Sequence, residues 1–208
     1  FGWNPVEDKI QVKVPSLFFA KKSRDRLSDG TVSFDPAVHD IKAFVPKDLT
    51  LRMVTSKYGS IYDYLGILAP ALARTKCLLS ATNKAVDGWD DVMDPSLRAK
   101  WLKEFLYIEK LKGFNFTRAK LPIDAIDCKL RVLSFGDAAL LVFILGAWGG
   151  FKRKCGAWSC QLLIGKSLLC DSTWTIPMAE LVALMGSCNL SWVILLALRE
   201  WLDPSSVS

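Results

Sequence analysis

The chain has 208 residues, of which 51% are hydrophobic, and a formal net charge of +6. This length accommodates one or two small domains with a real hydrophobic core. The six cysteines form no C-x-x-C pair and the chain has one histidine, His39, which argues against a structural zinc site. We take residues 138–151 as the longest nearly uncharged run. It is shorter than the roughly 20 residues that span a bilayer, so we expect a buried strand pair and no membrane partner.

The beginning of the chain carries no targeting signal. Phe1 stands in place of an initiator methionine, and no charged segment followed by an apolar core comes after it. We therefore interpret the chain as an internal fragment of an intracellular protein, cytoplasmic or nuclear. Residues 9–14 alternate polar with β-branched side chains, which predicts a half-exposed strand. The positive charge favours an anionic partner such as nucleic acid, although many ordinary soluble proteins are equally basic.

Residues 55–70 form an apolar stretch that Gly66 and Pro70 interrupt, which is typical of a tight structural connector. A helical pattern follows over residues 71–84, and an acidic loop over residues 85–95. The Trp89-Asp90-Asp91 string in this loop invites comparison with a polymerase metal site. We reject that comparison because the next residues, Asp94-Pro95, have the composition of a helix start and not of a hairpin.

The predicted helix over residues 96–112 has an apolar side and a basic side. Its apolar side carries Leu97, Trp101, Phe105 and Ile108 at helical spacing. The more exposed residues are expected to be Arg98, Lys103, Glu104, Lys110 and Lys112. With Arg118 and Lys120 that follow, the basic residues are candidates for phosphate contacts. The alternative is an ordinary solvated helix face.

Two carboxylates are the candidate catalytic residues. Asp137 closes the strand-like segment 131–139, where a buried sheet meets solvent. Pro177 suits an early helix position, which puts Glu180 inside the first turn of a helix. A strand-end Asp and a helix-borne Glu could converge, so we expect their carboxylates to lie close enough to share an ion. Each residue also has an ordinary structural explanation, as a turn Asp and as a Glu that stabilises a helix N-terminus.

The order of these motifs resembles the ribonuclease H region of Pao/BEL-type retrotransposon polyproteins. The matching residues are Phe135, Asp137 and Ala138, Lys166-Ser167, Thr175-Ile176-Pro177 and Glu180-Leu181, together with Asp63, Leu65, Gly66, Leu68, Ala69 and Pro70 upstream. The resemblance implies an α/β (α+β) fold, in which helices precede an incomplete ribonuclease H-like sheet. It implies three segments: the end of a reverse transcriptase region in 1–54, a helical connection in 55–127, and a partial ribonuclease H-like domain in 128–208.

By the same resemblance, Asp137 and Glu180 are catalytic metal ligands for Mg²⁺ or Mn²⁺, Asp203 is a third ligand, and the substrate is the RNA of an RNA–DNA hybrid. The chain departs from the family pattern at Ala139, where Ser is usual, and at Met178, where Arg is usual. It also stops before the last strand and helix of the nuclease. We therefore expect activity in the intact parent polyprotein and none in this chain alone. The alternatives are a non-catalytic nucleic-acid or protein interaction module and a small membrane-associated protein.

Overall fold

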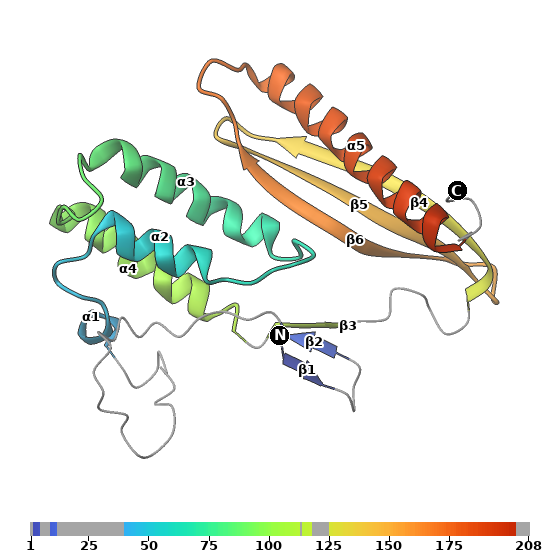
Figure 1. Ribbon diagram of the computed structural model, residues 1–208, viewed down its shortest axis with the longest axis horizontal. Helices are drawn as coiled ribbons and strands as arrows, with labels where there is room; N and C mark the ends of the chain where they lie inside the picture. Colours follow the sequence, from blue (N-terminus) through green and yellow to red (C-terminus); the bar gives the residue numbers. More distant parts are fainter. Residues whose placement is uncertain (1, 5–8, 12–39, 113, 118–124, 203–208) are drawn as a thin grey trace. The chain divides into compact units, whose positions relative to one another are not determined.

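The computed structural model describes residues 2–4, 9–11, 40–112, 114–117 and 125–202 (Figure 1). The described helices are α1 Ile41–Phe44, α2 Leu51–Gly59, α3 Ala69–Ala85, α4 Pro95–Glu109 and α5 Ile176–Leu202. The described strands are β1 Gly2–Asn4, β2 Lys9–Gln11, β3 Asn115–Thr117, β4 Ala125–Ala138, β5 Val142–Arg153 and β6 Trp158–Leu169. These helices and sheets confirm the α/β (α+β) prediction.

The chain divides into two compact units. Unit 1 comprises Phe1–Tyr62 and Leu78–Phe116, and unit 2 comprises Asp63–Cys77 and Thr117–Ser208. The division falls inside α3. The three segments predicted from the sequence have other boundaries and stay a prediction.

Two short strands near the N-terminus and β3, which follows α4, form a three-stranded sheet in the order β1-β2-β3. β1 pairs antiparallel with β2, with Trp3 opposite Ile10. Lys9–Gln11 is therefore a strand, as its alternation predicts, whereas residues 12–14 of that prediction lie outside the described part of the chain.

The core of unit 1 is helical. α4 begins at the predicted place, because the Asp94 side chain accepts hydrogen bonds from the Ser96 and Leu97 amides and Pro95 occupies the first turn. Trp101 and Phe105 are fully buried, and the Trp101 indole donates to the Thr82 hydroxyl at 2.9 Å. The predicted apolar side of α4 is confirmed by the buried cluster of Ile41, Val45, Leu49, Leu51, Val54, Met93, Leu97, Trp101, Leu102, Phe105 and Ile108.

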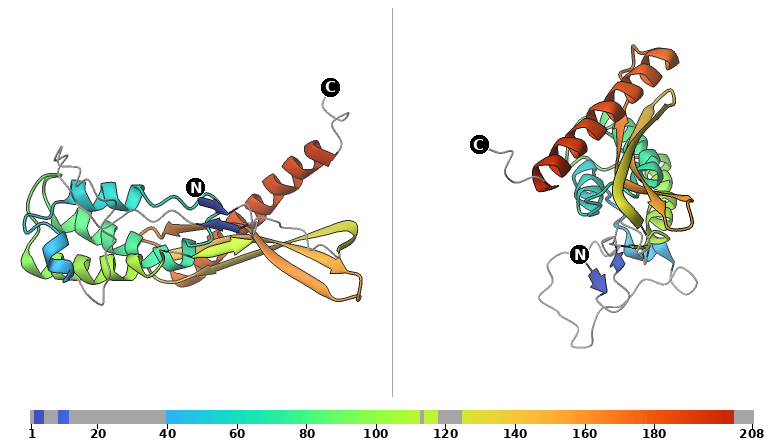
Figure 2. Two further views of the ribbon diagram at one scale, coloured as in Figure 1. Left: turned by 90° about the horizontal axis from the view of Figure 1, so that it is seen from below. Right: turned by 90° about the vertical axis from the view of Figure 1, so that its right-hand side faces the viewer.

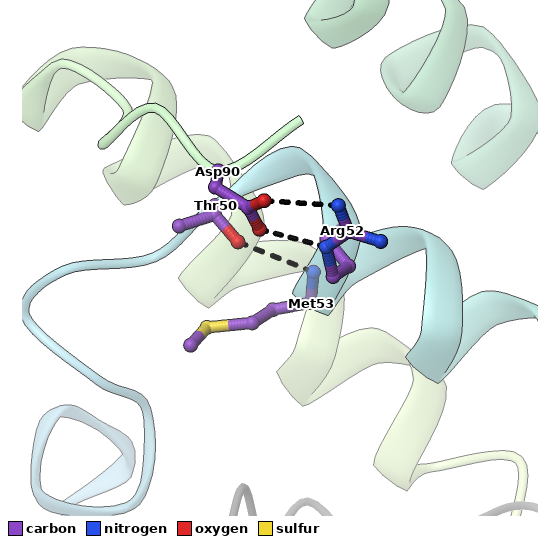
Figure 3. A network of polar contacts seen from close by, with 4 residues as sticks. All are labelled: Thr50, Arg52, Met53 and Asp90. Atoms are coloured by element: carbon purple, nitrogen blue, oxygen red, sulfur yellow. Dashed lines mark hydrogen bonds and ion pairs between the residues drawn. The ribbon is translucent and has the colours of Figure 1, made fainter. Parts of the chain in front are cut away.

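The acidic loop before α4 is tied to the start of α2 (Figure 3). The Arg52 guanidinium donates to both carboxylate oxygens of Asp90, at 2.7 and 2.9 Å, and the Thr50 hydroxyl accepts from the Met53 amide as the helix cap. The Met93 amide donates to the Leu49 carbonyl at 2.9 Å. Asp90 is thus engaged in an ion pair, and the following residues begin α4, which agrees with our rejection of a polymerase metal site here.

Unit 2 is built on an antiparallel sheet in the order β4-β5-β6, with the apolar strand β5 in the centre. α5 lies along one face of this sheet (Figures 1 and 2). Phe143, Leu145 and Ala183 form the buried cluster between them. The run 138–151 therefore forms the turn after β4 and one long strand, β5, and our expectation of a strand pair is wrong in this respect.

Small residues let α5 approach β4 closely. A Cβ atom added to Gly136 would lie 2.5 Å from the Ala183 carbonyl group, and the Ser134 hydroxyl donates to the Ser191 hydroxyl at 2.7 Å. The helix buries Ala179, Ala183, Ser187 and Ser191 at four-residue intervals. Gly136 and Ser134 thus stand on the face of β4 that α5 covers.

By length and composition alone, α5 is long and apolar enough over Ile176–Ala197 to cross a membrane. Residues 181–198 carry no charge, so our choice of 138–151 as the longest nearly uncharged run was wrong. A core helix of a soluble protein passes the same test, and α5 packs its small side chains on the sheet. Much of its opposite side is exposed, including Leu184, Met185 and Trp192.

The connector before α3 is held by backbone contacts in unit 2. The Asp63 carboxylate accepts hydrogen bonds from the Ile67 and Leu68 amides at 3.0 and 2.7 Å. Gly66 has a φ of 65°, and its Cβ, if present, would lie 1.7 Å from the Gly165 carbonyl oxygen in β6. The Gly165 amide donates to the Leu65 carbonyl at 2.7 Å. The structure therefore gives residues 63–66 a structural role, as the sequence predicts.

Candidate functional site

Asp137 is the next-to-last residue of β4, where it pairs across the sheet with Ile144. It is exposed, and its carboxylate accepts a hydrogen bond from the Ala138 amide at 3.0 Å. Successive residues of a strand point to opposite faces, so Asp137 projects from the face opposite Gly136 and α5. The prediction of a carboxylate at the end of a strand is confirmed.

Glu180 is the fifth residue of α5 and is exposed. The helix begins at Ile176, its first turn contains no acidic residue, and the Ala179 amide donates to the Thr175 carbonyl. Glu180 therefore stands just past the first turn, and our placement of it inside that turn is corrected by one residue. The cause is that Ile176 already belongs to the helix together with Pro177.

The two carboxylates belong to the same end of the sheet. Gly136 contacts α5 at Ala183 and Leu184, whereas Ser134, farther back along β4, contacts Ser191. α5 thus runs antiparallel to β4, and one turn before Ala183 brings Glu180 level with the end of the strand.

Asp137 and Glu180 can share an ion only if their carboxylates approach each other around the end of β4. Because Asp137 projects from the face away from α5, its carboxylate must reach around the end of β4 toward the helix. β4 is the outer strand in the order β4-β5-β6. The pairing of Asp137 with Glu180 stays a prediction that depends on this reach.

The described residues do not supply the rest of the predicted metal-ligand set. Asp203, the third predicted ligand, lies outside the described residues. Within the part of the chain that the structure describes, no group of three or more His, Cys, Asp or Glu side chains is placed to hold a metal ion. Two exposed carboxylates offer hard oxygen donors of the kind that Mg²⁺ prefers, but they do not by themselves supply the ligand set of a two-ion centre.

Comparison with known proteins identifies the sequence family. A sequence model of the Pao retrotransposon-like RNaseH-like domain matches residues 50–204. The chain belongs to this family. Searches of curated proteins and of solved structures found no match. The Pao match extends from α2 to the end of α5, so it includes the helical core of unit 1 as well as the sheet. The helices and the three-stranded antiparallel sheet are consistent with an incomplete RNase H-like fold.

The basic residues proposed for phosphate contacts divide into three groups. Lys103 and Lys110 are exposed on and just after α4. Arg98 instead donates to the Val45 and Pro46 carbonyls at 2.9 Å, and Lys112 pairs with the buried Glu109. Arg118 and Lys120 lie outside the described residues. Of the six, Lys103 and Lys110 therefore remain the described residues whose charge faces solvent.

One prediction about α4 is wrong. Glu104, which we expected on the exposed side, has 3% of its surface exposed and lies among the buried residues of the helix. Helical spacing places it next to Trp101 and Phe105, so the buried side of α4 is wider than a stripe of four residues.

Proposed function

We propose that this chain is part of a Pao-type retrotransposon polyprotein whose RNase H-like domain hydrolyses the RNA strand of RNA–DNA hybrids. The observation that carries the proposal is the family match over residues 50–204, and the positions of Asp137 near the end of β4 and of Glu180 near the start of α5 support it. An intracellular setting, cytoplasmic or nuclear, follows from this role. The reverse transcriptase end in residues 1–54 belongs to the same proposal.

Asp137 and Glu180 are the residues we assign to the divalent ions, Mg²⁺ or Mn²⁺, in the parent polyprotein. When bound there, such ions activate water and stabilise the leaving oxygen of a phosphodiester. The described residues do not complete the ligand set, so a third ligand has to come from elsewhere, and Asp203 is our candidate.

We propose further that this chain by itself does not hydrolyse a hybrid at a useful rate. Two carboxylates give too little negative charge and too few oxygen ligands to hold two hydrated cations. Binding of a hybrid to α4 should be weak and strongly salt-dependent, because Lys103 and Lys110 offer phosphate contacts without a base-reading set.

The test compares this chain with a longer segment of the same reading frame, each with magnesium or manganese and a labelled RNA–DNA hybrid. The longer segment should cleave the hybrid, and Asp137→Asn and Glu180→Gln should each abolish cleavage. Asp87→Asn is the matched control, since Asp87 is an exposed acid in unit 1.

The outcomes separate the claims. Cleavage by this chain that Asp137→Asn removes would overturn the proposed inactivity and would make Asp203 a strong candidate ligand. Cleavage by the longer segment that survives both substitutions would overturn the site assignment. Absence of cleavage by both chains, with intact folding by circular dichroism, would support a non-catalytic module.

A further inference from the structure

The face of the β4-β5-β6 sheet that α5 does not cover carries an aromatic and basic surface. Alternation along β4 places Arg131, Leu133 and Phe135 on this side, because Ser134 and Gly136 face α5. Cross-strand pairs extend the surface to β5 and β6. We call it the aromatic face and define it by Arg131, Leu133, Phe135, Trp148, Lys152 and Trp158.

A glycine makes room for an aromatic ring on this face. Gly146 is opposite Phe135, and a Cβ added to it would lie 2.4 Å from the Trp148 ring. The Trp148 ring therefore lies over the backbone at Gly146. The Phe135 ring meets Trp148 edge to face, with centroids 5.1 Å apart, and 55% of Phe135 is exposed. Packed in this way, the aromatic rings are held in place while part of their surface stays open to solvent.

Trp158 and Arg131 stack on each other beside Gly150. A Cβ added to Gly150 would lie 3.6 Å from both the Arg131 side chain and the Trp158 ring. The Arg131 guanidinium lies over the Trp158 ring, 4.3 Å from its centroid, and Trp158 is 45% exposed. An exposed arginine stacked on an exposed indole offers a planar cation and an aromatic surface at one place.

The charge around the aromatic face is positive. Arg131 stands on this face, whereas Lys166 pairs with Leu145 and so stands on the face that α5 covers. Residues 131–170 contain one acidic residue. Lys152 pairs with Trp158 across β5 and β6, so it belongs to the same side, and Lys154 follows in the exposed turn. The acidic residue is Asp137, at the far end of the row that Arg131, Leu133 and Phe135 begin.

We propose that the aromatic face binds single-stranded nucleic acid, with bases stacked on Phe135, Trp148 and Trp158 and phosphates near Arg131 and Lys152. Aromatic side chains stack on any base, and basic residues beside them follow the charged backbone. The positive charge of Arg131 and Lys152 attracts a polyanion such as nucleic acid and disfavours an uncharged apolar partner. This function goes beyond hybrid hydrolysis, because it needs neither Glu180 nor a divalent ion.

The experiment measures binding of a fluorescein-labelled oligodeoxythymidylate of about 15 nucleotides, a length suited to one small stacking surface. Fluorescence anisotropy is recorded with the full 208-residue chain, in EDTA, over a series of salt concentrations. Trp158→Leu and Arg131→Gln are the test variants. The chain supplies a matched control in unit 1, where Arg52 lies over the exposed Trp89, 5.9 Å from its ring centroid. The control variants are Trp89→Leu and Arg52→Gln.

Trp158→Leu should weaken binding roughly tenfold, within the range measured for loss of one stacked base. Arg131→Gln should also lower the slope of log affinity against log salt by about 0.7, the value for one contact to a single strand. The control variants should leave both quantities unchanged. The proposal would be overturned if the test variants and the control variants lost affinity equally, or if neither set lost affinity.

Further measurements distinguish a loss of nucleic-acid binding from misfolding of the variant and from association of two copies of the chain. Lys152→Gln changes an exposed side chain and should lower the salt slope without altering the circular dichroism spectrum. If Trp158→Leu changed the sedimentation coefficient of the chain but not its affinity for the oligonucleotide, a second copy would be the occupant. That result would also overturn the proposal.

Discussion

Units 1 and 2 bury their large side chains to different degrees. The helices of unit 1 enclose Trp101 and Phe105, and the indole of Trp101 is hydrogen-bonded inside the core. In unit 2 the described sheet and α5 bury Phe143, Leu145 and Ala183 between them, while the outer side of α5 exposes Leu184 and Trp192. The candidate site and the aromatic face both lie in unit 2, the unit with open surfaces.

This difference separates two kinds of residue. The buried Trp101 and Phe105 of unit 1 contribute to stability, whereas the set of exposed aromatic residues on the aromatic face of unit 2 has to be explained by binding or by association. Unit 2 combines its buried side chains with close backbone approaches, at Gly66 with Gly165 and at Gly136 with α5. Substitutions can therefore test the two units by different mechanisms.

The largest expected effect is that of Trp101→Ala. Trp101 is fully buried and donates to Thr82, so its removal leaves a large cavity and takes away one buried hydrogen bond, while the Thr82 hydroxyl still donates to the Leu78 carbonyl. We expect a loss of about 3–5 kcal/mol in the free energy of unfolding, measured by urea denaturation. The control is Trp192→Ala on α5, where 62% of the side chain is exposed and the change should stay within about 0.5 kcal/mol. Similar losses in both variants would contradict the contrast between the units.

Gly66→Ala should have the next largest effect and should act on unit 2. Gly66 combines a left-handed φ of 65° with the contact to Gly165, so a methyl group cannot be accommodated without moving the connector. We expect a loss of roughly 1–3 kcal/mol, the cost of a residue held in an unfavourable backbone conformation.

Hydrogen exchange localises that effect. The Gly165 amide, which donates to the Leu65 carbonyl, should lose protection in Gly66→Ala. Gly59→Ala is the control, because nothing lies within 4 Å of the added Cβ at that position in α2. Unchanged protection of the Gly165 amide in Gly66→Ala would show that the connector does not depend on this glycine.

The sequence predicted features that depend on local patterns. The spacing of Trp101 and Phe105 predicted the buried side of α4, and the Asp94-Pro95 pair predicted where it begins. The apolar run ending at Asp137 predicted β4, and Pro177 predicted the start of α5. In each case, neighbours within one or two turns or one strand determine the outcome.

The features that the sequence could not predict depend on residues far apart in the chain. The contact of Gly66 with Gly165 and the bonds from Arg98 to residues 45 and 46 join separate segments. The order of the motifs predicted that Asp137 and Glu180 lie at one end of the sheet. It did not predict on which face of the sheet each residue stands. The side of β4 that α5 covers is set by the close approach at Gly136, which leaves Asp137 on the other side.

The units also differ in the surfaces they offer to nucleic acid. With a single-stranded probe, Lys152→Gln with Lys154→Gln should lower the salt slope by about 1.4, or 0.7 for each contact. Lys103→Gln with Lys110→Gln, which removes the same charge from the α4 region of unit 1, should lower the slope by less. Binding constants measured for both double variants over a series of salt concentrations give the two slopes. An equal change in both double variants would mean that general positive charge, and not the aromatic face, attracts the single strand.

The smallest expected effects are opposite pH dependences of Asp94 and Asp63. Hydrogen bonds from Ser96 and Leu97 lower the pKa of the Asp94 carboxyl below its ordinary value of 3.8. Burial raises the pKa of Asp63 above 3.8, and hydrogen bonds from the Leu68, Ile67 and Gly66 amides offset part of that rise. Asp94 therefore adds stability above the unfolded pKa and loses it as the pH falls through the folded pKa. Asp63 loses stability as the pH rises from the unfolded pKa through the folded one.

Asparagine variants remove the charge of each carboxylate. Asp94 accepts both amides at Oδ1, which Asp94→Asn can keep, whereas Asp63 accepts from Ile67 at Oδ1 and from Leu68 at Oδ2, so Asp63→Asn keeps one of the two bonds. The measurement is the protection factor of the Leu97 amide for Asp94 and of the Leu68 amide for Asp63, between about pH 3 and 7. Relative to Asp94→Asn, the unsubstituted chain should gain protection at Leu97 as the pH rises. Relative to Asp63→Asn, it should lose protection at Leu68 over the same range. A change of the same sign at both amides would mean that burial of Asp63 does not outweigh its hydrogen bonds, so that its charged form would be stabilised in the folded chain as that of Asp94 is.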